Sequence, residues 1–221
     1  MSQSTSTATG AVTDRAASIH AGPRMTALTA RPTPTGTHEV RSVALGDPLV
    51  RPLLDELSRE YWTRYRRVLT AEQLREEMEH YPAQDFAPPH GGLVVVLDDG
   101  ATVAGGAFRR RTEPELGDPA RLARPGTRRR DGTPAVRTAE LKRIWTRSTH
   151  RRRGLARVVL AELERRAVER GYRRLYLTTG PRQPEAAGLY LATGYAPLFD
   201  TGTDPEEIGP LAFEKWLEVV P

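Results

Sequence analysis

The sequence predicts an α/β fold built on a mixed β-sheet. Some segments alternate apolar and polar residues with a period of two, as strands do, and others repeat apolar residues every three or four positions, as helices do. These segments follow one another in the order β-α-α-β-β-β-α-β-α-β-β, without an internal repeat. Strands interspersed with helices in this order indicate one domain with a mixed sheet.

The first elements of the domain are a strand and two helices. Residues 38–44 alternate and end at the turn-forming run 46–48. Thr70 is typical of a helix N-cap, so the second helix is expected from Ala71 to about residue 81, where Pro82 ends it. One face of the first helix is expected to consist of Leu53, Leu54, Leu57 and Tyr61.

A hairpin and a long loop follow. Residues 93–97 form an apolar run typical of a buried strand, and Asp98-Asp99-Gly100 provides turn chemistry before a partner strand over 101–111. The loop over 113–137 is either a mobile lid or a plain insertion. The arginine triplets 109–111 and 128–130 are interpreted as solvated charge at strand ends or in loops.

The C-terminal half contains the most informative stretch, residues 146–156. Residues 139–146 alternate like a strand, whereas Leu155, Val159 and Leu163 recur like a helix, so the backbone changes conformation across the arginines. Unpaired amides at a helix start, the helix dipole and the small Gly154 together favour an anion such as a phosphate or pyrophosphate. Further strands are expected at 174–179 and 211–217, with Pro184 in the first turn of a helix.

The same stretch resembles a known family. Arg151-x-x-Gly154-x-Ala156 is similar to the Arg/Gln-x-x-Gly-x-Gly/Ala motif of the GCN5-related N-acetyltransferases (GNAT), which use acyl-coenzyme A. The resemblance continues to the block Leu189-Tyr190-x-x-x-Gly194-Tyr195 and spans about sixty residues, from 139 to 198. The asparagine that relatives often place after the fifth strand is absent from 180–185, which leaves that local contact open.

This resemblance implies a single GNAT-like domain over 38–221, with a mixed sheet that splays between its fourth and fifth strands and helices on both faces. It implies that the backbone of Ile144, Trp145 and Thr146 binds the pantetheine arm of acetyl-CoA like an added strand. The expected phosphate-binding residues are Arg151, Arg152, Arg153, Gly154, Leu155, Ala156 and Arg157.

Two residues are candidates for catalysis by the same resemblance. Tyr190 occupies the position of a general acid that protonates the departing thiolate, although a packed tyrosine is the alternative. Glu140 is the candidate base, and a salt bridge to Lys142 or Arg143 at the sheet margin is the equal alternative.

Strand alternation places Glu140, Lys142, Ile144 and Thr146 on one face of the strand. Leu141, Arg143 and Trp145 are then expected on the opposite face.

Composition limits the function classes. The chain has no cysteine, so disulfides, thiol nucleophiles and thiolate metal sites are excluded, and no metal is expected from its isolated histidines. No run of apolar residues is long enough to span a membrane, and we expect a cytoplasmic protein. Residues 1–37 are rich in Ser, Thr, Gly and Pro and are expected to be a disordered tail.

The expected function is transfer of an acetyl group from acetyl-CoA to a primary amine of a small molecule, amino acid or peptide, by direct attack. The alternatives are a non-catalytic coenzyme A-binding protein and a nucleic-acid-binding protein that uses the arginine clusters. The latter is disfavoured because no aromatic residues are interleaved with the arginines. The acceptor is not specified by the sequence, and a homodimer is left open.

Overall fold

The computed structural model describes residues 38–111 and 136–218. Within these ranges the strands form a seven-stranded sheet in the order β1-β2-β3-β4-β5-β7-β6. The strands are β1 (Glu39–Ser42), β2 (Gly92–Asp98), β3 (Ala101–Arg110), β4 (Thr138–Thr146), β5 (Arg174–Thr179), β6 (Ala196–Pro197) and β7 (Leu211–Trp216). The helices are α1 (Arg51–Tyr65), α2 (Ala71–Glu79), α4 (Leu155–Glu169), α5 (Pro184–Ala192) and α6 (Pro205–Ile208), with short 3-10 turns at Pro48–Val50, Ala83–Phe86 and Ser148–His150.

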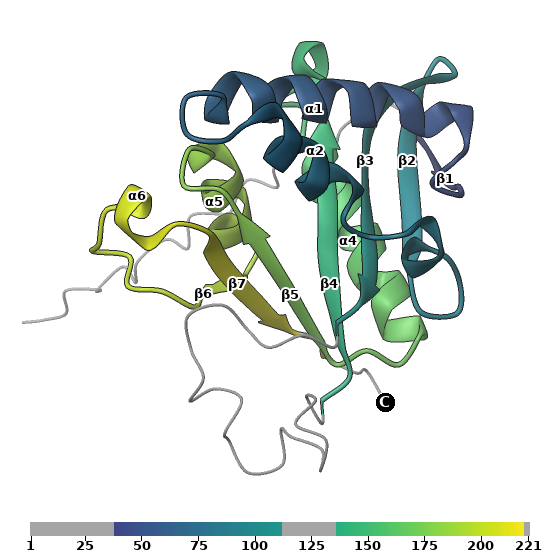
Figure 1. Cartoon of the computed structure of the whole chain (residues 1–221). Helices are drawn as coiled ribbons and strands as arrows, with labels where there is room; N and C mark the ends of the chain where they lie inside the picture. Colours follow the sequence, from purple (N-terminus) through teal and green to yellow (C-terminus); the bar gives the residue numbers. More distant parts are fainter. Residues whose placement is uncertain (1–37, 112–135, 219–221) are drawn as a thin grey trace, which may run out of the picture. The chain divides into compact units, whose positions relative to one another are not determined.

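The helices cover both faces of the sheet, as expected. Helices α1 and α2 cross the face toward the viewer in Figure 1, and α4 lies behind β2, β3 and β4. The larger apolar core lies on the α4 face, where Leu155, Val159 and Leu163 are buried against the sheet. These three residues are the ones whose spacing predicted the helix, so burial of one apolar stripe accounts for its position.

Local signals in the sequence correspond to the observed element ends. Thr70 forms a capping box with Gln73, in which the Thr70 hydroxyl accepts from the Gln73 amide and the Gln73 side chain accepts from the Thr70 amide. The second helix ends at Glu79, two residues earlier than expected. The Asp98-Asp99-Gly100 turn joins the antiparallel strands β2 and β3, with Asp99 and Gly100 at positive φ.

Strands β4 and β5 are parallel for only part of their length. Three pairs connect them, the last of which is Glu140 with Tyr176. Beyond this pair the two strands diverge, and Figure 1 shows the opening between them. Among the described residues, the segment from Leu141 to Thr146 therefore has no strand on its β5 side, which confirms the expected splay and leaves one backbone edge of β4 available.

A β-bulge interrupts β4 next to this opening. Gly105 of β3 pairs with Trp145, and Ala107 pairs with Lys142, so the single residue between them on β3 lies opposite two residues of β4, Arg143 and Ile144. Arg143 lies in the bulge at φ 58, in the left-handed region that non-glycine residues rarely occupy.

The bulge makes the expected strand phase wrong beyond Lys142. Ile144 packs into the core on the α4 face, whereas Trp145 packs on Leu53 and Leu57 of α1 on the opposite face. Trp145 thus shares a face with Lys142, which lies over the Tyr81 ring on the α1 side. Simple alternation failed because the extra residue reverses the orientation of all side chains that follow it.

The predicted tail over residues 1–37, the triplet 128–130 and nearly all of the predicted loop over 113–137 lie outside the described residues. Among the helices of the described ranges, none is long and apolar enough to cross a membrane.

Candidate active site

A cavity of about 780 Å³ lies where β4 and β5 diverge. Its walls come from α1, α2, β4, β5, α5 and the segment around α6. Five tyrosines from both halves of the chain line it, namely Tyr61, Tyr65, Tyr81, Tyr176 and Tyr190. A cavity of this size, with an aromatic wall that also carries charged side chains, suits a small organic ligand with polar groups.

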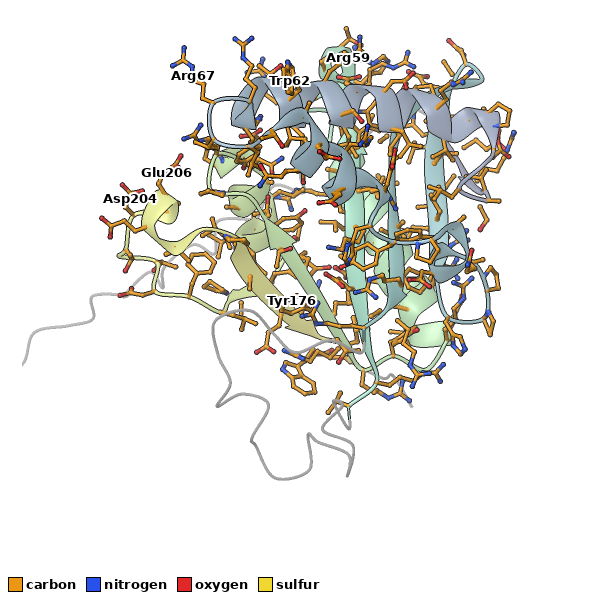
Figure 2. The ribbon with its side chains drawn as sticks, in the orientation of Figure 1. Arg59, Trp62, Arg67, Tyr176, Asp204 and Glu206 are labelled. Carbon is orange, nitrogen blue, oxygen red and sulfur yellow. The ribbon has the colours of Figure 1, made fainter. Side chains whose placement is uncertain are left out.

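The cavity lies on the inner side of α1. Figure 2 shows Tyr176 on β5 near the place where the two strands meet, whereas Arg59 and Trp62 on α1, and Arg67 in the turn that follows it, point away from the sheet. Trp62 is 44% exposed and is not part of the cavity wall.

Tyr190, the predicted general acid, lies on α5 and lines the cavity. Its ring packs on Tyr195 and Phe213, with ring centroids 5.7 Å and 5.6 Å away, and only 6% of the residue is exposed. Burial, and to a smaller extent the neighbouring Tyr61, raises the pKa of Tyr190 above its ordinary value of 10.0. The phenol therefore keeps its proton at neutral pH and is available as a donor.

Glu140, the predicted base, lines the same cavity but is surrounded by cations. Its Oε2 atom lies 2.6 Å from Arg109 Nη2 and 3.1 Å from Arg111 Nη1, and its Oε1 atom lies 3.0 Å from Lys142 Nζ. The alternative salt bridge to Lys142 is thus present. It is not at a sheet margin, because β4 is a central strand and Glu140 is 2% exposed.

The prediction of solvated charge for the triplet 109–111 is wrong for Arg109 and Arg111. Arg109 on β3 and Arg111 directly after β3 are buried, because their spacing of two residues in extended chain places both beside Glu140. The guanidinium groups also stack on aromatic rings, that of Arg109 3.8 Å above Tyr81 and that of Arg111 3.8 Å above Tyr176. The spacing was a usable signal, but the acidic partner is some thirty residues away in the sequence.

The predicted phosphate-binding site at residues 152–156, called the cradle below, has backbone donors that are not used among the described residues. The backbone amides of residues 152–156 donate to no acceptor in the described part of the chain. Arg152 at φ 63 and Gly154 at φ 82 turn the chain into α4, which begins at Leu155. A Cβ at Gly154 would have no atom within 4 Å. Successive unpaired amides at the start of a helix of fifteen residues form a concave donor site for phosphate oxygens.

Two acids of α1, Glu56 and Glu60, contact this loop. Glu60 Oε2 lies 2.8 Å from Arg151 Nη2, and Glu56 Oε1 accepts a hydrogen bond of 2.8 Å from the Ser148 amide. Arg151 therefore lies against α1 rather than against the amides. Arg157 donates a 3.4 Å hydrogen bond to the Ala192 carbonyl.

The predicted pantetheine segment lies along the open edge of β4. Ile144 lines the cavity, while Trp145 is buried under α1. The indole Nε1 of Trp145 and the Oγ1 of Thr146 are buried and have no hydrogen-bond partner within the described ranges.

The end of α1 is tied to the loop after β5. The Arg182 amide donates to the Tyr65 hydroxyl at 3.3 Å, and Arg182 Nη1 donates to the Arg64 carbonyl at 3.1 Å. Within the same loop, the Gln183 side-chain oxygen accepts a hydrogen bond from the Gly180 amide at 3.0 Å. These bonds connect the α1 wall to the β5 wall across one end of the cavity.

The sequence matches the model of a known protein family. The model of the Acetyltransferase (GNAT) family matches residues 54–195, which is more than half of the chain. The chain belongs to the GNAT acetyltransferase family. The sheet with its parallel β4–β5 pair and the helices around it is the GNAT fold. No curated protein matches the sequence.

Solved GNAT structures share this fold. The PaiA N-acetyltransferase from Thermoplasma acidophilum, in complex with coenzyme A, is 13% identical, with a TM-score of 0.54 over 82% of this chain and 99% of that one. A protein from Klebsiella pneumoniae, assigned as an acyl-CoA N-acyltransferase, is 22% identical, with a TM-score of 0.52 over 82% and 99%. YncA from Salmonella typhimurium, assigned as an acetyltransferase and solved with acetyl-CoA, is 12% identical, with a TM-score of 0.52 over 84% and 97%. At these identities the similarity establishes the fold.

Proposed function

We propose that this protein transfers an acetyl group from acetyl-CoA to a primary amine by direct attack. The observation that carries the proposal is that the open edge of β4 leads from the cavity to a row of unpaired amides at the start of α4. An elongated ligand with phosphates at one end and a reactive group at the other fits this arrangement.

The residues present suit such a coenzyme. The amides of 152–156 would hold the pyrophosphate, since they point outward at the positive end of the α4 dipole. The backbone of residues 144–146 would receive the pantetheine arm along the unpaired edge of β4. Bound acetyl-CoA would supply the acetyl group as a thioester. Because the chain has no cysteine, no cysteinyl acyl intermediate can form.

Tyr190 would act as the general acid. The residue lines the cavity, and burial keeps its phenol protonated by raising its pKa. A phenol in that state can donate a hydrogen bond, and then a proton, to a departing thiolate. The packing on Tyr195 and Phe213 restricts the ring, so the donor position is held by the core.

Glu140 would serve mainly as an anchor for cations, with direct proton abstraction as the competing role. Its two oxygen atoms are each within 3.1 Å of at least one cation. Cation donors that engage both oxygens leave little of the carboxylate accessible to an acceptor amine. An acceptor amine that enters in its neutral form needs no dedicated base.

Two measurements test the proposal. Calorimetry should detect acetyl-CoA binding that is weakened by substitution of Gly154, and release of free thiol should depend on an added amine. A screen should include amino acids, simple amines, polyamines, aminoglycosides and short peptides. Binding without thiol release with any amine would indicate a coenzyme sensor, and the absence of binding would refute the proposal. Retention on DNA at moderate salt, abolished by deletion of residues 1–37, would instead favour a nucleic-acid binder.

A further inference from the structure

One cation of the cavity wall has more hydrogen-bonding capacity than its neighbours use. Lys142 lies on β4 directly before the bulge, lines the cavity and has a side chain that is 18% exposed. Its ammonium group contacts Glu140 Oε1 at 3.0 Å and lies 4.8 Å from the centre of the Tyr81 ring. An ammonium group has three protons to donate, and one carboxylate oxygen accepts only part of that capacity.

Glu140 forms salt bridges with two arginines as well as with Lys142. The same carboxylate is within 2.6 Å of Arg109 and 3.1 Å of Arg111, so its single negative charge is divided among three cations. Within the described ranges, the other acid of the cavity wall is Glu206, and it pairs with Arg182 at 2.7 Å. The described wall thus offers no unpaired acid to a second ammonium group, which disfavours polycationic acceptors such as polyamines and aminoglycosides.

We propose that Lys142 binds a carboxylate of the acceptor, so that the acceptor is an amino acid rather than a simple amine or a polycation. This inference rests on the proposed acetyltransferase function and specifies its substrate class. Lys142 and the predicted general acid Tyr190 line the same cavity, so both functional groups of one small amino acid face one space. The tyrosines around it, among them Tyr61 and Tyr81, favour an acceptor with an apolar or aromatic side chain.

The experiment compares the common amino acids with their amides, which lack the carboxylate and keep the amine. Binding of each acid and each amide is measured by isothermal titration calorimetry, with and without coenzyme A, and kcat/KM is measured by thiol release with acetyl-CoA. An amide has the less basic amine, so a larger fraction of it is neutral at a given pH. Chemistry alone therefore favours the amide, and a preference for the acid reports recognition of the carboxylate.

We expect at least one amino acid to bind about 10-fold to 100-fold more tightly than its amide, the range of one or two charge-assisted hydrogen bonds. Lys142→Met should remove this difference, because it weakens binding of the amino acid and leaves binding of the amide nearly unchanged. Lys142→Arg, which retains the cation, should restore most of it. Thermal unfolding of each variant shows that the domain is folded during the titrations.

The second lysine of the chain provides the matched control. Lys215 also contacts one carboxylate, Glu164 Oε2 at 2.8 Å, and one tyrosine ring, Tyr195 at 5.3 Å, and it donates to the Thr193 carbonyl at 2.9 Å, but it does not line the cavity. Lys215→Met therefore removes the same kind of interaction elsewhere and should leave the preference for the acid intact.

Equal binding of acids and amides, binding of no amino acid, or an acid preference that survives in Lys142→Met would each overturn the inference. Different results would refute the proposed function, namely no binding of the coenzyme or no thiol release with any amine. Thiol release with simple amines but without an acid preference would leave the acetyltransferase proposal standing and refute only the assignment of the acceptor.

Discussion

Replacing Glu140 by glutamine removes the charge that three buried or half-buried cations share. The side chain of Glu140 is 2% exposed, and the cationic nitrogens of Arg109, Arg111 and Lys142 lie 2.6, 3.1 and 3.0 Å from its oxygens. Removal of one partner from a buried ion pair costs about 3–5 kcal/mol, because the remaining charges stay desolvated. In a domain of this size that corresponds to a fall in Tm of roughly 6–20 °C.

The assay is urea unfolding followed by tryptophan fluorescence, with the slope m compared between variants to test for two-state behaviour. Glu162→Gln is the matched control, since Glu162 also pairs with two arginines, Arg165 at 2.7 Å and Arg166 at 2.6 Å, but on the surface of α4. Solvent screening limits that loss to about 1 kcal/mol.

A free energy of unfolding within 1 kcal/mol of the unsubstituted protein, the scale of an exposed pair, would refute the anchoring argument for Glu140. Combining Glu140→Gln with Lys142→Met should cost less than the sum of the two single changes, because both partners of one pair are then removed. A loss of kcat without loss of stability would favour the base role instead.

Three further predictions concern the site and its neighbourhood. Tyr190→Phe should lower kcat at least about tenfold with little change in the affinity for coenzyme A by calorimetry, and unchanged turnover would exclude the acid role. Gly154→Leu should weaken coenzyme binding at least about tenfold, because the side chain would fill the cradle. The control Gly100→Leu changes a glycine at the similar φ of 77 in the β2–β3 turn and should leave coenzyme binding unchanged. Equal coenzyme affinities of the two variants would show that the phosphates bind elsewhere. Burial raises the pKa of Tyr190 and of Tyr195 above the ordinary 10.0, so the folded state keeps protons that the unfolded state loses. The free energy of unfolding should therefore fall above pH 10 by about 1.4 kcal/mol per pH unit for each tyrosine, and a urea titration from about pH 8 to pH 11 that shows constant stability would contradict this.

Much of the site could be predicted from local patterns. The change from strand to helix around Gly154 placed the cradle, because amides at a helix start are unpaired whatever the rest of the fold does. The block that contains Tyr190 was found through its resemblance to a family motif, and the structure places this residue in the cavity wall. Both signals lie within a few residues of the groups that they concern.

The partners of Glu140 could not be predicted in the same way. Arg109 lies directly opposite Glu140 only in the register that joins β3 to β4, and the two residues are separated by a long connection. The interaction of Glu60 with Arg151 likewise depends on how α1 crosses the sheet. Sequence spacing carries no information on such contacts, since the energy that selects the register comes from the whole sheet and its core.

The sequence by itself determined the order of the elements, their caps and turns, and the donor row at the start of α4, because these follow from short-range backbone geometry. Only the tertiary structure decided which way the side chains of β4 point. The bulge at Arg143 moves Ile144 to the α4 core and Trp145 beneath α1, while Lys142 remains in the cavity wall. An extra residue in one strand is defined only by its pairing with a neighbouring strand, so a pattern read along one segment cannot reveal it.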